Sequence, residues 1–343
     1  MDKFIINLLP RGSTYNIRGI PLPLYDVIGG TCSCLDHILL PGIQYPAKGQ
    51  KAFLQGYKTI GGGVSANALV FLSRMGMETA FFGLAGKDAA GDYLTKEMND
   101  LGIDTSGYMQ KKDYKTPQSF IVIDPQTGER TIMAFQPPFP MKYWDLEEFQ
   151  NLCTPSPACF LFDTHHIPLK LKMAQWGKDK GIPMVWDIGT YKKGLEELFP
   201  YMDYFIAPDD FLEGYFGVPG ISGEKDIGHY IQSISREGQF ILTVITAGDD
   251  GAYALLNDEV VHFPALKVPQ IKDTTGAGDI FHAGFVYGLI QGWDIEHTLQ
   301  WATVCAGLSC GYIGGRPVHM KLEMIEREYD KYTKNLQWRR VKL

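Results

Sequence analysis

One acidic residue, Asp279, follows three small residues in the stretch DTTGAGDIF, and an apolar run begins directly after it. The apolar pattern predicts a helix whose first turn holds the acid. Backbone amides at a helix N-terminus lack partners within the helix, and the positive end of the helix dipole attracts anions. Gly276, Ala277 and Gly278 would let their amides surround a phosphoryl group, while Asp279 takes a proton from an attacking hydroxyl. This interpretation predicts a phosphotransferase; the alternative is an ordinary helix start, in which the acid interacts only with the helix dipole.

Two other glycine-rich stretches compete as phosphate sites. Gly61, Gly63 and Ala66 fit the loose dinucleotide-binding pattern GxGxxA, and Asp88 follows at roughly the required distance. The preceding strand, QGYKTI, is polar rather than buried and parallel, which argues against a nicotinamide site. The stretch GLAGKDAAGD lacks the GxxxxGKS/T spacing of a P-loop, so Lys87 is expected to be a solvated loop residue.

Apolar strand-like runs alternate with helical patterns along the chain. Such alternation predicts a parallel sheet covered by helices on both faces. Two extended segments, residues 51–60 and a hairpin at 119–135, break this rhythm and indicate a small β-rich flap. Residues 326–340 are expected to form a charged closing helix or a loose end. The expected strands lie at 25–32, 78–86, 158–165, 183–189, 204–208 and 240–248, and the clearest helical patterns at 64–76, 88–102 and 168–181.

The composition is that of a globular protein, with 343 residues, 45% of them apolar, and a net charge of −7. The acidic balance argues against a nucleic-acid partner, and no run reaches the roughly 18 apolar residues that a membrane helix needs. The first residues lack the layout of a signal peptide, so a cytoplasmic protein is expected. The six cysteines show no zinc spacing. Cys32 and Cys34 are expected to alternate on one strand as buried, reduced thiols.

Two motifs resemble the signatures of the ribokinase-like (PfkB) carbohydrate kinases. DTTGAGDIFHAGF looks like their C-terminal signature, and GGGVSANALVFLSRMGMETAFFGLAGKDAAGDYL is similar to their N-terminal one. The resemblance runs from about residue 25 to about residue 316. It implies a Rossmann-type three-layer α/β/α core with a small β-sheet lid, ATP as donor, Mg²⁺, and phosphorylation of an alcohol.

The resemblance also implies a domain layout. Residues 1–24 would be an N-terminal extension, and residues 25–335 would form the kinase domain. Segments at about 36–60 and 115–136 would form the lid, and residues 336–343 would be a tail. By analogy with the family, two copies are expected to pair through the lid.

On the sugar side, the resemblance makes Asp279 the catalytic base and the three small residues before it the anion hole. Asp36, at the end of the first expected strand, would grip sugar hydroxyls. Gly62, Gly63 and Asn67 would form the second substrate loop. Taken alone, Asp36 would be a turn residue and Asn67 a helix-start residue.

On the nucleotide side, the turn TAGDDG resembles the TxGxxG turn that packs against the nucleotide phosphates and ribose. The family often binds a monovalent cation nearby, which would place K⁺ near Asp273 and Thr275. The cofactor-binding residues implied are Thr246, Gly248, Gly251, Thr275 and, beside the adenine, Thr303.

Two positions depart from the family pattern. The Asn-x-x-Glu motif that organises water around Mg²⁺ should follow IAP, but Asp209 replaces the Asn and Leu212 stands where Glu is expected. Asp210 and Glu213 would take over the role one residue later, with Glu213 acting on Mg²⁺ through water. Cys34 stands where the family often has an Asn two residues before the first acid, which argues against a ribose-type contact.

The segments TPQSFIVIDPQTGERTIMAFQPP and SCGYIGGRPV resemble the ketohexokinase and sulfofructose-kinase branch most. The acceptor would then be a primary hydroxyl of a ketose. His165 and His166 would face the cleft, or be loop residues without a role, and Arg316 would bind an anionic substituent or cap the chain end. A nucleoside kinase of the same fold and a non-catalytic sugar-binding relative remain the alternatives.

Overall fold

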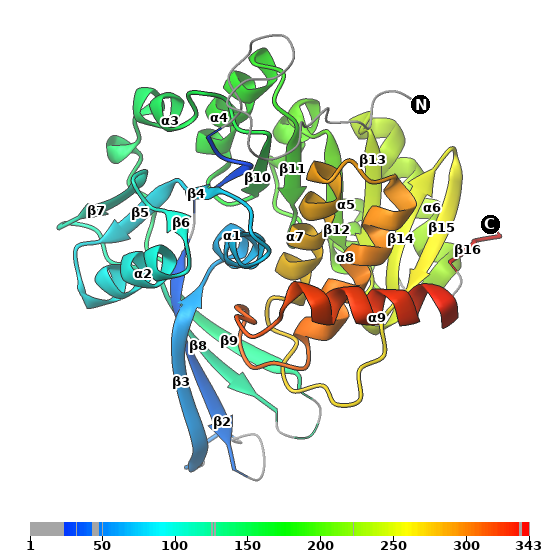
Figure 1. The fold of residues 1–343 in the computed structure, drawn as a ribbon, viewed down its shortest axis with the longest axis horizontal. Helices are drawn as coiled ribbons and strands as arrows, with labels where there is room; N and C mark the ends of the chain where they lie inside the picture. Colours follow the sequence, from blue (N-terminus) through cyan, green and yellow to red (C-terminus); the bar gives the residue numbers. More distant parts are fainter. Residues whose placement is uncertain are drawn as a thin grey trace.

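The computed structural model describes residues 24–31, 33–42, 48–49, 51–124, 126, 128–221, 223–335 and 338–342. Within this part of the chain a ten-stranded sheet forms the centre (Figure 1). The strands from β6 to β13 pair in parallel, and those from β13 to β16 pair antiparallel. In order across the sheet they are β16 (Arg339–Arg340), β15 (Glu259–Pro264), β14 (Gly251–Leu256), β13 (Leu242–Thr246), β12 (Tyr204–Pro208), β11 (Met184–Asp187), β10 (Cys159–Asp163), β1 (Val27–Gly30), β4 (Thr79–Phe81) and β6 (Ile103–Asp104).

The central strands are apolar along their whole length because both faces of the sheet are covered. Strands β10 and β11 read CFLFD and MVWD, and all of their residues are buried. Only their last residues are acidic. The parallel pairing therefore places Asp163 and Asp187 side by side at the carboxyl edge of the sheet.

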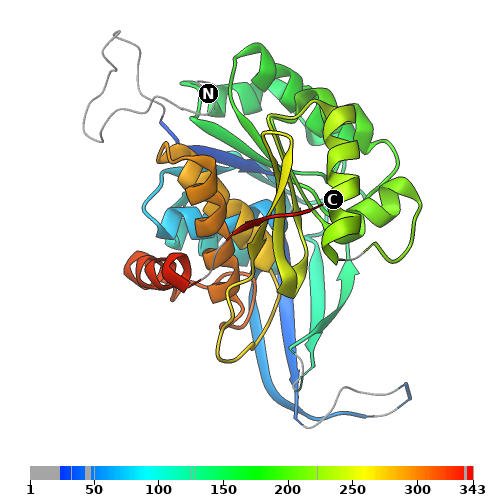
Figure 2. The same cartoon turned by 90° about the vertical axis from the view of Figure 1, so that its right-hand side faces the viewer.

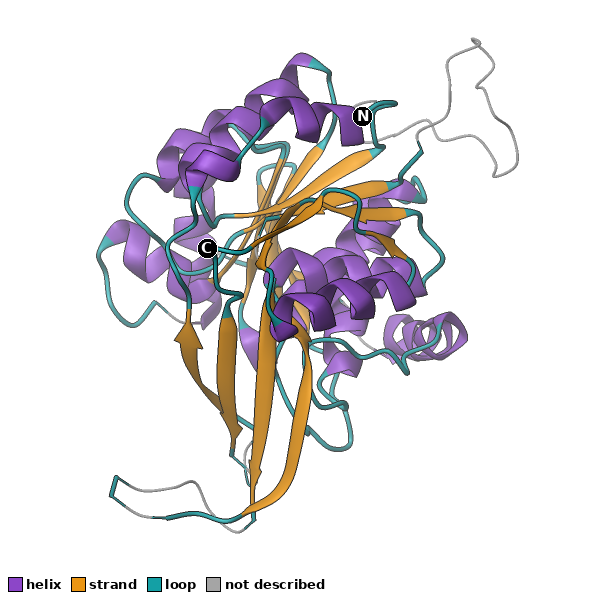
Figure 3. Cartoon of the chain, turned by 90° about the vertical axis from the view of Figure 1, so that its left-hand side faces the viewer, coloured by secondary structure: helices purple, strands orange, loops and turns teal. Residues whose placement is uncertain are grey.

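Helices cover both faces of the sheet (Figures 2 and 3). Two separate apolar cores lie between the three layers. This three-layer arrangement confirms the predicted fold class. No helix in the described ranges is long and apolar enough to cross a membrane. One face carries α1 (Val64–Arg74), α2 (Ala89–Asp100), α7 (Ala277–Ile290), α8 (Ile295–Ser309) and α9 (Leu322–Asn335); the other carries α3 (Leu146–Leu152), α4 (Ile167–Asp179), α5 (Asp209–Phe216) and α6 (Gly223–Gly238).

A second sheet of four strands stands off the main body, at the bottom of Figure 1, where the flap was expected. Its strands, in order, are β3 (Leu54–Gly62), β2 (Cys34–Pro41), β8 (Gln118–Ile123) and β9 (Arg130–Phe135). Its own small core consists of Ile38, Ile60, Ile121 and Ile123. Strand β3 leads directly through Gly63 into α1, so the root of this lid sheet is covalently joined to the first core helix.

Three local predictions were wrong. Asp36 lies in the lid strand β2 and not at the end of the first strand, because the chain leaves the main sheet after Gly30. The run 78–86 is split into β4 and β5 (Gly83–Gly86), and β5 pairs instead with β7 (Tyr108–Lys111). The main sheet is mixed rather than parallel throughout.

The expected N-terminal extension lies outside the described residues apart from Leu24, as does Cys32. Near the C-terminus, α9 is followed by the short strand β16. The proposed domain boundaries remain predictions. Short 3₁₀ helices at Met141–Tyr143, Leu195–Tyr201 and Gly248–Asp250 complete the described elements.

Candidate active site

A cleft of about 330 Å³ lies between the lid sheet and the N-terminus of α7. Open α/β sheets bind ligands at the carboxyl ends of their strands, and small-molecule sites start at about this volume. Seven of the predicted site residues line it: Asp36, Gly63, Asn67, His165, Thr275, Gly276 and Asp279. The other lining residues are Cys34, Val64, Pro117, Ser119, Ile121, Arg130, Ile132, Ala134, Phe135 and Gln136.

Asp279 occupies the first turn of α7, as predicted from the apolar run that follows it. Gly276 caps this helix in the left-handed conformation, with φ of 76°, and its carbonyl accepts a hydrogen bond from the amide of Ile280 at 2.9 Å. A Cβ at this position would lie 2.6 Å from Cα of Gly315, so only glycine fits. The chain therefore brings bare backbone and a carboxylate together at one helix N-terminus.

The Asp279 carboxyl is half-buried at the floor of the cleft. Burial raises its pKa to about 8, and the nearby Asp187 carboxyl adds to this rise. A hydrogen bond from Asn67 Nδ2 to Asp279 Oδ2, at 2.7 Å, acts in the opposite direction and favours the ionised form. A carboxyl with a raised pKa in a cleft has the properties of a general base.

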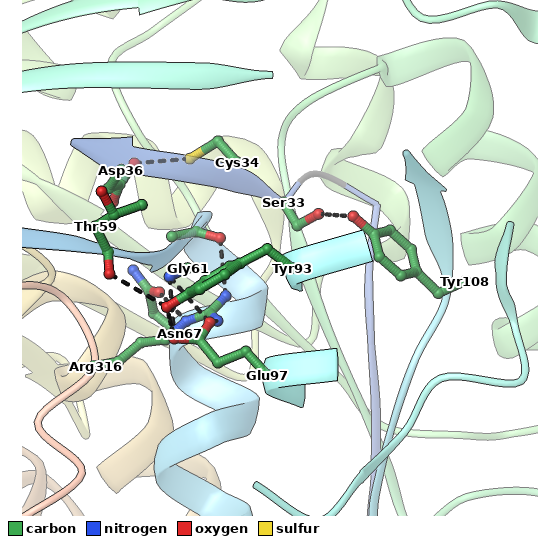
Figure 4. Close-up of polar contacts among 11 residues, drawn as sticks. Ser33, Cys34, Asp36, Thr59, Gly61, Asn67, Tyr93, Glu97, Tyr108 and Arg316 are labelled. Atoms are coloured by element: carbon green, nitrogen blue, oxygen red, sulfur yellow. Dashed lines mark hydrogen bonds and ion pairs between the residues drawn. The ribbon is translucent and has the colours of Figure 1, made fainter. Parts of the chain in front are cut away.

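Asp36 faces Asp279 from the lid, and its own surroundings are unusual for an acid. It is 5% exposed, and burial raises its pKa. The thiol of Cys34 donates to its Oδ1 at 3.1 Å (Figure 4). A Cβ at Gly62 would lie 2.0 Å from Asp36 Oδ2, so the glycine at this position makes room for the carboxyl. Gly62 thus lies behind Asp36 rather than at the cleft surface.

Arg316 lies behind the cleft wall instead of in the cleft. Its side chain is 1% exposed and forms an ion pair with Glu97 of α2. Its Nε donates to Asn67 Oδ1 at 3.0 Å (Figure 4). Its Nη2 donates to the Gly62 carbonyl at 3.0 Å. The guanidinium is thus already bonded to the protein on three sides.

The two histidines after β10 have different surroundings. His165 lines the cleft, and its Nδ1 lies 3.3 Å from Asp163 Oδ1. His166 packs against Phe139 with ring centroids 4.3 Å apart, and burial lowers its pKa to about 4. Of the two, His165 alone is among the residues that line the cleft.

Asp163 is fully buried and paired with the fully buried Lys170, whose Nζ lies 3.3 Å from Asp163 Oδ1. Burial alone would raise the pKa of Asp163, but Lys170 and the neighbouring hydrogen bonds hold it well below its usual range. Lys170 also donates to the Gly30 carbonyl at the end of β1, and Ser65 Oγ of α1 donates to Asp163 Oδ2 at 2.7 Å. The pair and its two partners thus join four elements, β1, β10, α1 and α4, directly behind His165.

Of the predicted nucleotide residues, Thr275 lines the cleft, whereas the other four are not among its lining residues. Thr246 ends β13, and Gly248 and Gly251 flank the tight turn after it. Gly251 has a φ of 110°, and a Cβ there would lie 2.1 Å from the Phe263 carbonyl oxygen. Thr303 is 4% exposed and donates its hydroxyl to the Leu299 carbonyl at 2.8 Å within α8.

Asp273 is 1% exposed and holds two loops together. Its Oδ1 accepts from the amide of Thr275 at 2.8 Å, and its Oδ2 accepts from the amide of Gly314 at 2.7 Å. The buried Oγ1 of Thr275 has no hydrogen-bond partner among the described residues. An unsatisfied buried oxygen beside a carboxylate is compatible with a monovalent cation.

The acidic residues after β12 are poorly placed to bind a metal ion together. Leu212 is fully buried in the core, and Glu213 accepts a hydrogen bond from the amide of Gly220 at 2.9 Å. Asp209 and Asp210 lie in the first turn of α5, and burial raises the pKa of Asp209. Among the described residues, no three His, Cys, Asp or Glu side chains lie close enough to bind a metal ion.

Four residues at or beside the cleft did not emerge from the sequence: Arg130, Ser119, Glu97 and Asp187. Arg130 and Ser119 line the cleft from the lid strands, and Arg130 Nη1 donates to Thr274 Oγ1 at 2.9 Å. The period-two alternation predicted the strands but not which face would meet the core. Asp187 was detectable as an acid ending an apolar strand, like Asp163 before it.

Replacing Asp279 with Asn should stabilise the protein increasingly as the pH rises. The folded pKa of about 8 exceeds the unfolded value, so stability falls from about pH 4 to about pH 8 as the unfolded chain ionises first. Asn does not titrate and can still accept the Asn67 hydrogen bond. We expect thermal unfolding to shift upward by about 2–4 °C at alkaline pH, corresponding to roughly 1 kcal/mol, and little at about pH 4. The exposed Asp249→Asn is the control; an equal shift at every pH would contradict the assignment.

Comparisons with known proteins identify the family of this chain. The pattern described as "pfkB family carbohydrate kinase" matches residues 31–320. Ketohexokinase from Mus musculus is 23% identical over 262 residues, covering 74% of this chain and 85% of the relative. A ribokinase from Staphylococcus aureus is 28% identical over 240 residues, covering 69% of this chain and 77% of the relative.

The solved structures show the same fold. Arabidopsis thaliana ribokinase complexed with ribose and ATP superposes with a TM-score of 0.75 at 18% identity, covering 89% of this chain and 98% of that one. The family pattern spans most of the chain and includes the lid strands and the helix that begins beside Asp279, so the family assignment applies to the whole kinase domain. The chain belongs to the pfkB family of carbohydrate kinases and is an ATP-dependent phosphotransferase.

Proposed function

We propose that the protein phosphorylates a hydroxyl of a ketose or related carbohydrate, with Asp279 as the general base. The observation that carries this proposal is the position of Asp279. Its carboxyl lies at the helix N-terminus, in the cleft, with a raised pKa and opposite Asp36. A substrate bound between these two acids has a hydroxyl within reach of the base.

In this mechanism Asp279 accepts the proton of the attacking hydroxyl as the phosphoryl group is transferred. The amides of Gly276 and Gly278 and the helix dipole stabilise the negative charge of that group. The Ala277 amide would join them by exchanging its 3.3 Å bond to the Thr274 carbonyl. Asp36 and Asn67 hold the sugar, with Gly62 and Gly63 supplying room and backbone. Most of the rate in phosphoryl transfer comes from such positioning and charge stabilisation.

The donor would lie along the turn after Thr246, with Gly248, Gly251 and Thr275 near its phosphates. Thr303 would act only by shaping this region from within α8, because its hydroxyl is already bonded to Leu299. Mg²⁺ in kinases is held by one or two carboxylates plus the substrate phosphates. Asp209, Asp210 and Glu213 are the acids available for that role after β12. Each already accepts one hydrogen bond, from the amide of Asp210, the hydroxyl of Thr190 and the amide of Gly220 respectively.

A monovalent ion such as K⁺ would be held by Thr275 Oγ1 and Asp273. When bound there, it would add positive charge next to the anion hole. Omitting K⁺ from the turnover assay described below tests this directly.

The ketose assignment is supported by the two segments that resemble the ketohexokinase branch and by the cleft-facing His165. A nucleoside is the second candidate. Phe135 lines the cleft and is 50% exposed, so it offers a ring on which a base could stack. The two substrates are distinguished by direct assay.

The test is ADP release with ATP, Mg²⁺ and K⁺ against fructose, sulfofructose, ribose, tagatose, 2-keto-3-deoxygluconate and adenosine. We expect turnover with one ketose. In the same assay Asp279→Asn should lose about 10²–10⁴-fold in kcat, because a general base typically contributes this much, while ATP binding persists. Near-wild-type turnover of the variant would exclude Asp279 as the base. If the wild type binds ATP but releases no ADP with any of the six acceptors, the result would support the alternative of a non-catalytic sugar-binding protein.

Arg130 is proposed to contact the transferring phosphoryl group. It reaches from the lid strand β9 to Thr274, two residues before Gly276, and its side chain lines the cleft. Arg130→Ala should lower kcat by on the order of 10²-fold, the loss typical for one charge-stabilising donor. Arg130→Lys should recover part of it, because the charge remains but the planar fork is lost. Unchanged kcat in both variants would assign Arg130 to lid closure alone.

The outer face of the lid is proposed to pair with a second copy of this chain. On it His37 stacks on Phe120 with ring centroids 4.9 Å apart, and Tyr57, Met133 and Phe120 are 60%, 57% and 41% exposed. Contiguous exposed apolar side chains of this kind mark interfaces. Sedimentation should show a dimer that Met133→Glu converts to a monomer; a wild-type monomer at all concentrations would contradict the pairing.

A further inference from the structure

The side-chain amide of Asn67 is held from both ends. Its Nδ2 donates to Asp279 Oδ2 at 2.7 Å, and its Oδ1 accepts from Arg316 Nε at 3.0 Å. Asn67 is 3% exposed, so water has little access to either bond. Asn67 thus connects the buried guanidinium to the proposed base.

The arginine decides which end of the amide faces Asp279. A guanidinium has donors only, so the group opposite Arg316 must be the amide oxygen. The amide nitrogen is then the group that points at Asp279, where it stabilises the ionised carboxylate. A reversed amide would set its oxygen against Asp279 and would favour the protonated carboxyl, which cannot act as a base.

Arg316 is itself fixed by its surroundings. Glu97 pairs with its Nη1 and also accepts from the amide of Gly61, at 2.9 Å to Oε2. A Cβ at Gly61 would lie 1.8 Å from Arg316 Nη1 and 2.1 Å from Glu97 Oε2. The ion pair therefore occupies the space that a side chain on the lid strand β3 would need.

The backbone beside Arg316 links the same three parts. A Cβ at Gly315 would lie 2.5 Å from Asn67 Nδ2, and one at Gly314 would lie 2.1 Å from Ile60 Cδ1 in the lid core. The Asp273 carboxylate accepts one hydrogen bond from the amide of Gly314 and another from the amide of Thr275, which lies just before α7. This segment thus contacts the lid root, the Asn67 amide and the loop before α7.

We propose that Arg316, held by Glu97, is a positioning residue that orients the Asn67 amide toward Asp279 and ties the root of the lid to the base. The inference rests on the proposed role of Asp279 as general base. It gives Arg316 a role different from contact with an anionic substituent of the sugar. Arg316 acts through Asn67 and does not touch the substrate.

The kinetic test uses the full chain with ATP, Mg²⁺ and fructose. Arg316→Met should lower kcat on the order of 10²-fold, the cost of a small misplacement of a catalytic group, with the KM for ATP unchanged. Arg316→Lys should be more stable to unfolding than Arg316→Met, because it keeps the positive charge opposite Glu97. Its kcat should stay as low as that of Arg316→Met, because an ammonium group cannot bond Asn67 and Gly62 at the same time. Arg339→Met is the control, since it breaks a more exposed arginine–glutamate pair, between Arg339 on the edge strand β16 and Glu224 on α6.

A double-mutant cycle separates positioning from a purely structural role. If Arg316 acts through Asn67, then Asn67→Ala combined with Arg316→Met loses no more kcat than Asn67→Ala alone. Additive losses, or full kcat in Arg316→Met, would overturn the proposal.

A structural experiment tests the inference separately from the proposed function. If the wild type turns over no acceptor, the proposed function is refuted, but the orientation of the Asn67 amide can still be observed. Crystal structures of the wild type and Arg316→Met should show the Asn67 Nδ2 to Asp279 Oδ2 contact of 2.7 Å lost in the variant. An Asn67 amide that keeps this bond without Arg316 would overturn the inference independently of activity.

Discussion

The burial of one carboxyl, Asp279, is the constraint on which the rest of the site depends. Burial penalises the charged form that a base requires, and the neighbouring Asp187 adds to the penalty. The helix N-terminus and the Asn67 amide oppose it, because both interact best with the ionised carboxylate. The result is a group whose pKa of about 8 lies near neutrality, where it can accept a proton and release it again.

A second set of buried charges keeps the neighbouring strands in place. Lys170 and Asp163 are both fully buried, and Lys170 also bonds the end of β1. A buried pair of this kind costs desolvation, and removing one partner leaves an uncompensated charge. The pair therefore holds the carboxyl ends of β1 and β10 together, directly beside the cleft. The positions of these strand ends are therefore fixed by a buried ion pair whose desolvation lowers the free energy of unfolding.

The sequence predicted the features that depend on neighbouring residues. The α7 helix and Asp279 were predictable because small residues, an acid and an apolar run follow one another without interruption. Asp36 was assigned to the wrong element because β1 and β2 follow closely and share an extended pattern, which does not reveal the change of sheet. The lid was predictable as two extended segments, since period-two alternation is a local signal. Its inward face was not, and so Arg130 was missed.

Contacts between distant positions explain the remaining gap. Asn67, Glu97 and Arg316 lie on three separate segments, and 219 residues separate Glu97 from Arg316. No local pattern relates them, whereas the family resemblance suggested Asn67 and Arg316 only as separate sugar contacts. Their shared geometry follows from the packing of α1 and α2 against the loop after α8.

The close approach of Gly61 to Arg316 has an evolutionary consequence. The two positions compete for one volume, so a side chain at position 61 requires the Arg316–Glu97 pair to shift. Among related kinases the two positions should therefore covary. Chains with short residues at both 97 and 316 would tolerate alanine or serine at 61, and chains with this arginine–glutamate pair should have glycine there. Such a pattern in related sequences would reflect the contacts that connect the lid strand to Asp279 in this structure.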